Sequence, residues 1–146
     1  MRVRDILGQK RSNLITVDVD SDIEKAVHLL IHHNIGGLPV RGHDGSVVGF
    51  VAERDIVRAV EQHGNAVRNV GVRTVMRPPP ICQADESLQE VMRRMTMERQ
   101  RHLVVEDKGQ AIGVVSVGDI VKHRLEQLET ETGVLRDYLA AQRAGR

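Results

Sequence analysis

Apolar positions along the chain predict the same series of elements twice. In the segment 20–33, "DSDIEKAVHLLIHH", the apolar residues recur with a helical period and gather on one face, at Ile23, Ala26, Val27, Leu30 and Ile31. A second such face follows at Leu88, Val91, Met92 and Met95. Each helix is preceded by a short extended stretch, at Ile15–Val17 and at Ile81–Cys82, and followed by two strands. These strands are "LPV" and "VVGFV", then "HLVVE" and "AIGVV", joined by the turns "GHDG" and "DKG". With a second helix after each hairpin, both units are predicted to be βαββα.

The two units align residue by residue. At an offset of 65, Asp20 meets Asp85 and Leu38 meets Leu103, and after a one-residue gap Gly49 meets Gly113. One unit of ~60 residues is too small for a secure core, so the two copies are expected to pack edge to edge. The predicted class is therefore α+β, with a first repeat at 1–60, a linker at 61–71, a second repeat at 72–124 and a helical tail at 125–146.

Each repeat closes on a similar phrase, "GFVAERDI" at 49–56 and "GVVSVGDI" at 113–120. A strand that ends at Ser116 and turns into a helix places a hydroxyl, backbone N–H groups and the Asp119 carboxylate together. Such a carboxylate can accept two hydrogen bonds from a ribose diol. The same spacing also fits a helix cap, and both interpretations stand for this copy. The first copy has Ala52, which cannot cap, and still keeps Asp55.

The βαββα unit, its tandem pairing and the closing phrase Gly-h-h-Ser-x-x-Asp (h, hydrophobic) resemble a pair of CBS domains, the cystathionine β-synthase regulatory module, in its stand-alone bacterial form. The resemblance implies a pseudo-twofold disc with two clefts that bind adenosine-containing ligands such as AMP, ATP or NAD. It places aspartate and hydroxyl on the ribose, basic residues on the phosphate and the first strand beside the base. The nucleotide-binding residues expected on this basis are Ser116, Asp119, Lys122, Ile81, Arg101, His102, Asp55, Arg54, Arg58 and Thr16.

The two expected clefts differ in sequence. Gly36 and Gly37 of the first copy correspond to Arg101 and His102 of the second, where the resemblance implies phosphate contacts. A helix end carrying Arg and His near its C-terminus is the alternative explanation. We therefore expect unequal affinities or different ligands in the two clefts.

Composition narrows the class of partner. The 146 residues carry a formal net charge of +1, with one Tyr, one Phe and no Trp, so neither a nucleic-acid surface nor a membrane surface is expected. No apolar run approaches the length of a membrane span, and the N-terminus lacks a signal-peptide pattern. A single cysteine, Cys82, fits a reducing compartment. The expected location is the cytoplasm.

Other chemistry-bearing residues favour ordinary structural roles. His28 and His32 have metal-ligand spacing on a helix, but a solvated face is the preferred interpretation. Cys82 is expected to be a buried small hydrophobe. The tail has a short apolar seam interrupted around Thr132 and Gly133, which could pair two subunits or lie across its own domain. The seam residues are Leu125, Leu128, Thr132, Leu135 and Leu139.

The sequence as a whole predicts a regulatory ligand sensor. We expect no catalytic residue, no metal and no catalytic cofactor, with AMP, ATP or NAD bound as a regulatory ligand. The expected partners are a second copy in a homodimer and an unidentified target protein. Two alternatives remain: a small nucleotide-acting enzyme that uses the histidine cluster, and a structural subunit whose clefts are empty.

Overall fold

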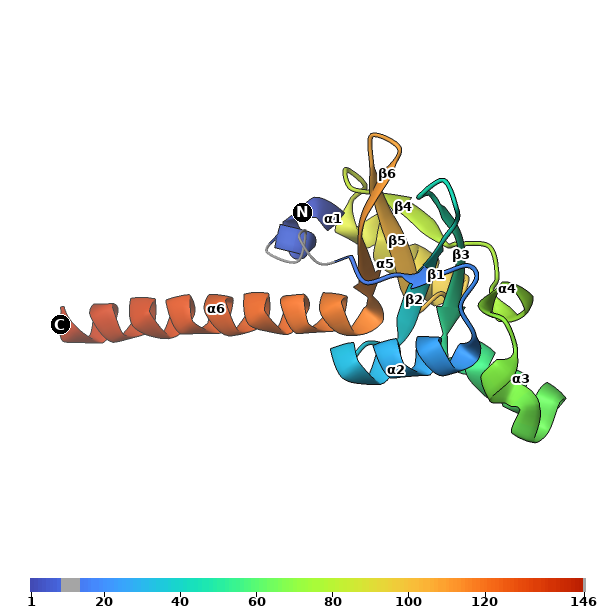
Figure 1. Cartoon of the computed structure of the whole chain (residues 1–146). Helices are drawn as coiled ribbons and strands as arrows, with labels where there is room; N and C mark the ends of the chain where they lie inside the picture. Colours follow the sequence, from blue (N-terminus) through green and yellow to red (C-terminus); the bar gives the residue numbers. More distant parts are fainter. Residues whose placement is uncertain (9–13, 146) are drawn as a thin grey trace.

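Two three-stranded sheets organise the chain, one in each repeat (Figure 1). The computed structural model describes residues 1–8 and 14–145. In each sheet the first strand runs parallel to the second, and the second pairs antiparallel with the third, so the strand orders are β1-β2-β3 and β4-β5-β6. The predicted α+β class and the βαββα order are confirmed.

The first repeat contains β1 (Val17–Asp18), α2 (Ile23–His33), β2 (Gly37–Arg41), β3 (Val47–Ala52) and α3 (Glu53–His63). Helix α2 begins where the Asp22 carboxylate accepts a hydrogen bond from the Lys25 N–H, and it ends at Asn34 in the left-handed conformation. Its buried residues are Ile23, Ala26 and Leu30, as the pattern predicts. Ile31 departs from the expected face and is 76% exposed, because it lies about 100° around the helix from Leu30.

The second repeat contains β4 (Ile81–Gln83), α5 (Leu88–Met97), β5 (His102–Asp107), β6 (Gln110–Ser116) and α6 (Val117–Ala144). Ser87 caps α5 by accepting from the Glu90 N–H. Leu88, Val91 and Met95 are buried as predicted, whereas Met92 is 39% exposed. Helix α6 passes through Gly133 without a break, so the last helix of the repeat and the tail are one 28-residue helix.

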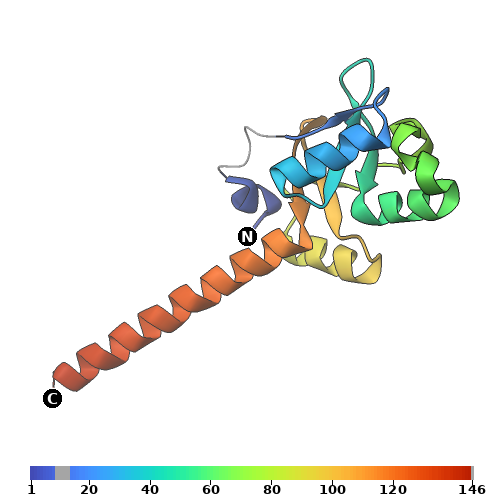
Figure 2. The ribbon, with the colours of Figure 1, turned by 60° about the horizontal axis from the view of Figure 1, so that its bottom comes forward.

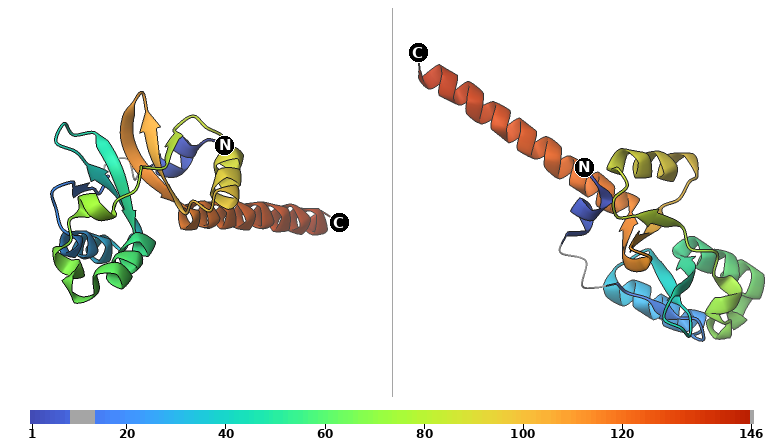
Figure 3. Two further views of the ribbon diagram at one scale, coloured as in Figure 1. Left: turned by 90° about the vertical axis from the view of Figure 1, so that its right-hand side faces the viewer. Right: turned by 90° about the horizontal axis from the view of Figure 1, so that it is seen from above.

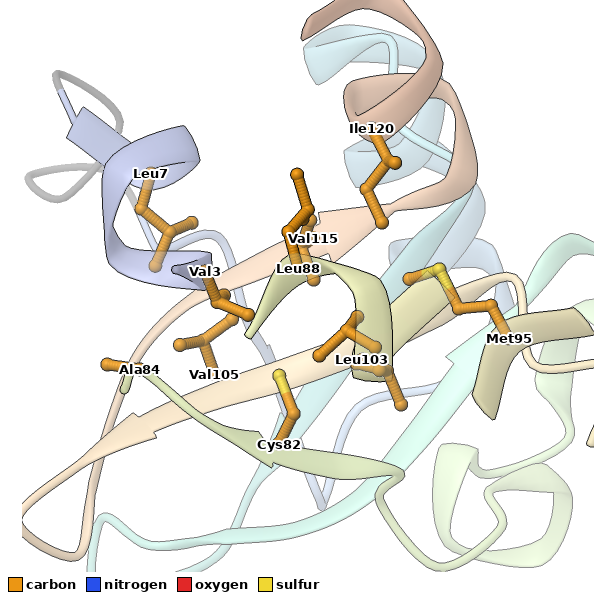
Figure 4. Packing of buried hydrophobic residues seen from close by; sticks show 11 residues of the cluster. Val3, Leu7, Cys82, Ala84, Leu88, Met95, Leu103, Val105, Val115 and Ile120 are labelled. Atoms are coloured by element: carbon orange, nitrogen blue, oxygen red, sulfur yellow. The ribbon is translucent and has the colours of Figure 1, made fainter. Parts of the chain in front are cut away.

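Each repeat completes its core with a short helix that precedes the other repeat in sequence. Helix α1 (Val3–Leu7) packs on the second sheet, where Val3 and Leu7 join Val105 and Val115 in one buried cluster (Figure 4). Conversely, α4 (Val72–Val75), which follows the 3-10 helix η2 (Gly64–Asn69), contributes Val72 to the core of the first repeat. The N-terminal helix is thus a structural part of the second repeat.

The two glycines that open the closing phrases make room for these exchanged segments. A Cβ atom on Gly113 would lie 2.9 Å from a methyl carbon of Leu7, and one on Gly49 would lie 2.5 Å from the sulfur of Met76. Both distances are shorter than normal packing allows. Close packing of the exchanged segments therefore explains why both copies of the phrase begin with glycine.

The repeats meet through a small apolar cluster between the sheets. Phe50 and Ala52 of β3 and Val104 of β5 form its buried part, and Phe50 is fully buried. The chain's one phenylalanine therefore joins the two halves of the molecule.

Beyond its first turns, α6 extends away from the two repeats (Figures 2 and 3). Ile120 is its buried residue, packed in the core of the second repeat. None of the described helices, α6 included, has the length and apolar character needed to cross a membrane.

Candidate functional site

The second closing phrase forms a reciprocal pair of hydrogen bonds at the junction of β6 and α6. The Asp119 N–H donates to the Ser116 hydroxyl oxygen at 3.1 Å, and the Ser116 N–H donates to the Asp119 carboxylate at 2.9 Å. This is the capping box that the sequence allowed. It fixes the rotamers of both side chains at the edge of a cleft, so the cap and a binding role are compatible.

The first closing phrase keeps half of this arrangement. The Ala52 N–H donates to the Asp55 carboxylate at 2.8 Å, and Asp55 is only 8% exposed. The same carboxylate oxygen, Oδ2, accepts a hydrogen bond from Arg77 Nε at 3.2 Å, and Arg58 lies 4.0 Å from the other oxygen. Asp55 is therefore engaged by a guanidinium from the segment that joins the repeats.

Arg77 is held in place by three further contacts. Its Nη1 donates to the Gln100 side-chain oxygen at 3.2 Å, and its guanidinium lies 5.5 Å from the centre of the Phe50 ring. Its backbone pairs with that of Phe50 through two hydrogen bonds, of 2.8 and 3.0 Å. At the offset of 65, the residue that corresponds to Arg77 is Ser12, which lies outside the described residues.

A cleft of about 690 Å³, here called the Asp119 cleft, lies between the repeats at the second closing phrase. The residues that line it are mostly apolar residues and glycines. Among the described lining residues there is no Arg or Lys. The lining consists of Leu7, Leu14, Ile15, His33, Asn34, Ile35, Gly36, Gly37, His102, Gly113, Val114, Ser116 and Asp119.

A second cleft of about 580 Å³, here called the Asp55 cleft, lies at the first closing phrase. Its described lining is dominated by charge, with five arginines against three carboxylates. The lining consists of Gly36, Ala52, Glu53, Arg54, Asp55, Val57, Arg58, Arg77, Glu98, Arg99, Gln100, Arg101 and His102. The excess of guanidinium groups makes this cleft suited to anions, and to phosphate oxygens in particular.

His102 and Gly36 line both clefts and so form the wall between them. The ring of His102 lies 5.7 Å from that of Phe50, and its Nδ1 is buried with no hydrogen-bond partner in the described part of the chain. Burial lowers the pKa of His102, Arg77 lowers it further, and the carboxylates of Glu53 and Asp119 oppose both effects. A Cβ on Gly36 would lie 3.2 Å from His102 Nε2, so the glycine allows the close approach.

Seven of the ten residues expected to bind nucleotide line these clefts. Ser116, Asp119 and His102 line the Asp119 cleft, and Arg54, Asp55, Arg58, Arg101 and His102 line the Asp55 cleft. The other three lie elsewhere. Lys122 is exposed on α6, Thr16 lies 3.5 Å from Arg41 Nε, and the Ile81 carbonyl accepts a hydrogen bond from Arg94 at 2.8 Å.

Sequence reasoning missed Arg77, Gln100 and Arg99 as lining residues. Arg77 lies just before three prolines in a segment without helical or strand periodicity, so nothing local indicates where its side chain points. Comparison of the repeats gave one signal for Gln100. It directly precedes Arg101, an expected phosphate contact, and it corresponds to Ile35, which precedes Gly36 in the first repeat.

The histidine and cysteine candidates, His28, His32 and Cys82, line neither cleft. His28 and His32 are exposed, and within residues 1–8 and 14–145 no group of three His, Cys, Asp or Glu side chains is arranged to hold a metal. Cys82 is buried in the core of the second repeat, and burial raises the pKa of its thiol to about 12.

Comparison with known proteins identifies the family. A family model for the CBS domain matches residues 3–62 and 72–126, which together make up most of the chain. The chain therefore belongs to the CBS domain family, as a tandem pair of repeats. Its fold is that of this class of protein, with an α6 that continues past the matched region.

Several solved structures share this architecture. The CBS-domain containing protein ATU1752 from Agrobacterium tumefaciens is 37% identical, with a TM-score of 0.79 over 84% of this chain and 92% of that one. CBSX2, solved in complex with AMP, is 25% identical, with a TM-score of 0.72 over 86% of this chain and 96% of that one. Among relatives found by sequence, inosine-5′-monophosphate dehydrogenase of Methanocaldococcus jannaschii is 30% identical over 77% of this chain, which spans only 22% of that enzyme's length.

Proposed function

We propose that this CBS pair is a regulatory module that binds an adenine nucleotide, with the nucleoside in the Asp119 cleft. The observation that carries the proposal is the Ser116–Asp119 pair fixed at the edge of an apolar cleft between the repeats. The AMP complex of the related CBSX2 supports the choice of ligand class. Regulation follows because a ligand that contacts both repeats favours the arrangement of repeats to which it binds more tightly.

The residues of the Asp119 cleft suit the two halves of an adenosine. Leu14, Ile15 and Val114 supply apolar surface for the base. The Asp119 carboxylate accepts hydrogen bonds from the ribose diol, and the Ser116 hydroxyl assists it. Thr16, next to Ile15 in the chain, remains a predicted contact on the base side.

The phosphates are proposed to point toward the Asp55 cleft. His102 and Gly36 line both clefts, so a phosphate that passes them reaches the arginine-rich side. Arg101, Arg54 and Arg58 then bind phosphate oxygens. A longer phosphate chain reaches more of these guanidinium groups, so the module can distinguish AMP from ATP.

A nucleoside in the Asp55 cleft faces a competitor inside the protein. Arg77 already donates to the Asp55 carboxylate at 3.2 Å, and a ribose diol must displace it to use that oxygen. The Asp55 cleft is therefore the weaker of the two for adenosine. Ile81 and Lys122, which lie outside both described linings, remain secondary predictions for contacts made when a ligand rearranges its surroundings.

We further propose that the module is not an enzyme, forms a homodimer, resides in the cytoplasm and transmits its state to a target protein. AMP, ATP and NAD are the candidate ligands, because each carries the adenosine that the Asp119 cleft fits. His28 and His32, on which the enzymatic alternative depends, are exposed and line neither cleft.

Titration calorimetry with AMP tests the assignment of the nucleoside site. Asp119→Asn should weaken AMP by about 5- to 150-fold, because one or two charge-assisted hydrogen bonds of ~1.5–3 kcal/mol become neutral ones of ~0.5–1.5 kcal/mol, a loss of about 1–1.5 kcal/mol for each bond. Asp137→Asn, on the exposed part of α6, is the matched control and should bind as the unchanged chain does. Unchanged AMP affinity in Asp119→Asn, with only a lower melting temperature, would show that the pair is a helix cap alone.

Incubation of the purified protein with ATP separates the two alternatives. Recovery of the ATP unchanged after prolonged incubation supports a sensor, whereas hydrolysis that stops in a His28→Ala/His32→Ala variant supports an enzyme. No heat of binding for adenosine, AMP, ATP or NAD at millimolar concentration would support a structural subunit and refute the proposal.

A further inference from the structure

The exposed length of α6 is a feature that nucleotide binding does not use. The helix has 28 residues, so it is about 42 Å long at a rise of ~1.5 Å per residue. In Figure 3 most of that length stands clear of both repeats. A single helix in water gains little stability from its own hydrogen bonds, and most helices in proteins depend on packing of an apolar face.

An apolar face runs along this projecting part. Leu125, Leu128, Leu135 and Leu139 are 45–57% exposed and alternate in spacings of three and four with Thr132 between them. This is the a/d pattern of a heptad repeat, with Leu125, Thr132 and Leu139 at a and Leu128 and Leu135 at d. Val121 and Gln142 occupy the d positions at its two ends. We call the face formed by the four leucines and Thr132 the α6 seam.

The α6 seam points away from the protein's own body. Among the residues of α6 that contact the body are Ile120, packed in the core of the second repeat, and His123 and Gln127, which contact the Met1 sulfur. In the same register these three are c, f and c positions, on the opposite side of the helix from a and d. A partner helix can therefore cover the seam without displacing the body.

The charges that flank the seam are complementary for a parallel pair of identical helices. Residues at g of one helix face residues at the following e of the other. Arg124 then faces the partner's Glu129, and Glu131 faces the partner's Arg136, each twice by symmetry. No like-charged pair arises among these positions.

The antiparallel alternative is less favourable. In the register that places Leu125 against the partner's Leu135, Glu129 and Glu131 each face their own counterpart, which is repulsive. We propose that the α6 seams of two copies form a parallel, two-stranded coiled coil, so that the C-terminal helix is the dimerisation element. The second copy of this chain is the partner that the seam fits.

Disulfide trapping tests both the contact and its direction. Gln142→Cys introduces a thiol at a d position near the end of α6, and a parallel pair places two such thiols side by side. Mild oxidation should give a covalent dimer of twice 16.3 kDa in the native protein. Asp137→Cys, at the outward f position, is the matched control and should give little. Cys82 is buried and does not compete.

Sedimentation equilibrium without nucleotide tests the seam itself. Leu135→Glu should raise the dimer dissociation constant on the order of a hundredfold, because two leucine side chains lose their burial. Ala140→Glu, which adds the same charge at a b position, should leave it nearly unchanged. An unaltered melting temperature of the repeats shows that Leu135→Glu remains folded.

Charge reversal adds an arm that does not depend on apolar contacts. Glu129→Lys/Glu131→Lys and Arg124→Glu/Arg136→Glu should each dimerise weakly alone and form a heterodimer when mixed. A monomer of 16.3 kDa at about 100 µM for the unchanged chain would overturn the proposal. So would a Leu135→Glu protein that stays a dimer, since association would then occur through the body. A monomer would also overturn the homodimer named under the proposed function, but none of these results bears on nucleotide binding, so the coiled coil and the nucleotide site fail independently.

Discussion

Replacing Arg77 with alanine should weaken the fold and strengthen adenosine binding in the Asp55 cleft. Arg77 donates to Asp55 and Gln100, both at 3.2 Å, and lies 5.5 Å from the Phe50 ring centre. Asp55 is 8% exposed, so the variant leaves a nearly buried carboxylate with only the more distant Arg58, 4.0 Å from its other oxygen, as a cationic neighbour. Binding of ribose by that carboxylate would no longer require displacement of Arg77.

The magnitudes follow from these contacts. Breaking a fully buried ion pair costs ~3–5 kcal/mol, but the Arg77 side chain is 34% exposed, so the expected loss of unfolding free energy is about 1–3 kcal/mol. In the variant, adenosine no longer has to break the charge-assisted hydrogen bond between Arg77 and Asp55. That bond is worth ~1.5–3 kcal/mol, so adenosine affinity should rise roughly 10- to 150-fold. Stability and affinity should therefore change in opposite directions.

Calorimetry and urea unfolding measure the two effects. Adenosine is the preferred ligand, because it has no phosphate that could lose a contact with Arg77. An Asp119→Asn background weakens binding in the Asp119 cleft, so that a gain in the Asp55 cleft is easier to measure. Arg73→Ala is the matched control, since Arg73 pairs with Asp20 on the surface and both side chains are 61% exposed. Arg73→Ala should lower the free energy of unfolding by less than about 1 kcal/mol and leave adenosine affinity unchanged.

A specific result would refute this reasoning. If Arg77→Ala loses stability but adenosine binds no better, or binds less well, Arg77 does not compete with the ribose. Asp55 would then act only as a structural anchor for the segment between the repeats.

Three further predictions concern the core and the wall between the clefts. Leu7→Ala should lower the free energy of unfolding in urea by ~2–5 kcal/mol, because Leu7 is buried in the core of the second repeat. The control Ile31→Ala should lower it by less than about 0.5 kcal/mol, because Ile31 is 76% exposed. Equal losses would contradict the packing of α1 on the second repeat. With its pKa raised to about 12, Cys82 should react with a thiol reagent at pH 8 only as the protein opens, and a native rate like that of free cysteine would disprove its burial. In the folded protein, His102 has a pKa below the ordinary 6.5 that it keeps in the unfolded chain. At pH values between the folded and the unfolded pKa, the unfolded chain binds more protons, so the free energy of unfolding should rise with pH. His102→Asn should flatten this slope and His28→Asn should not; equal slopes in all three proteins would rule His102 out as its source.

The sequence alone determined the elements and their repetition. Local periodicity places the apolar faces of α2 and α5, because a helix that buries one side must repeat its apolar residues every three or four positions. The closing phrase likewise located Ser116 and Asp119, because the geometry of a strand that turns into a helix is local.

Only the tertiary structure decided what these local units contact. The exchange of α1 and α4 brings Leu7 to Gly113, residues more than a hundred positions apart, and no periodicity encodes that choice. The same holds for Arg77, which lies in a segment without a repeating pattern and reaches Asp55 because its backbone pairs with Phe50. His102 became a wall shared by two clefts because the sheets of both repeats pack around Phe50. The leucine spacing of α6 was visible in the sequence, but the body contacts at Ile120, His123 and Gln127 decide that this face remains exposed. Spacing along a chain fixes which side chains share a face, whereas long-range packing fixes what that face meets.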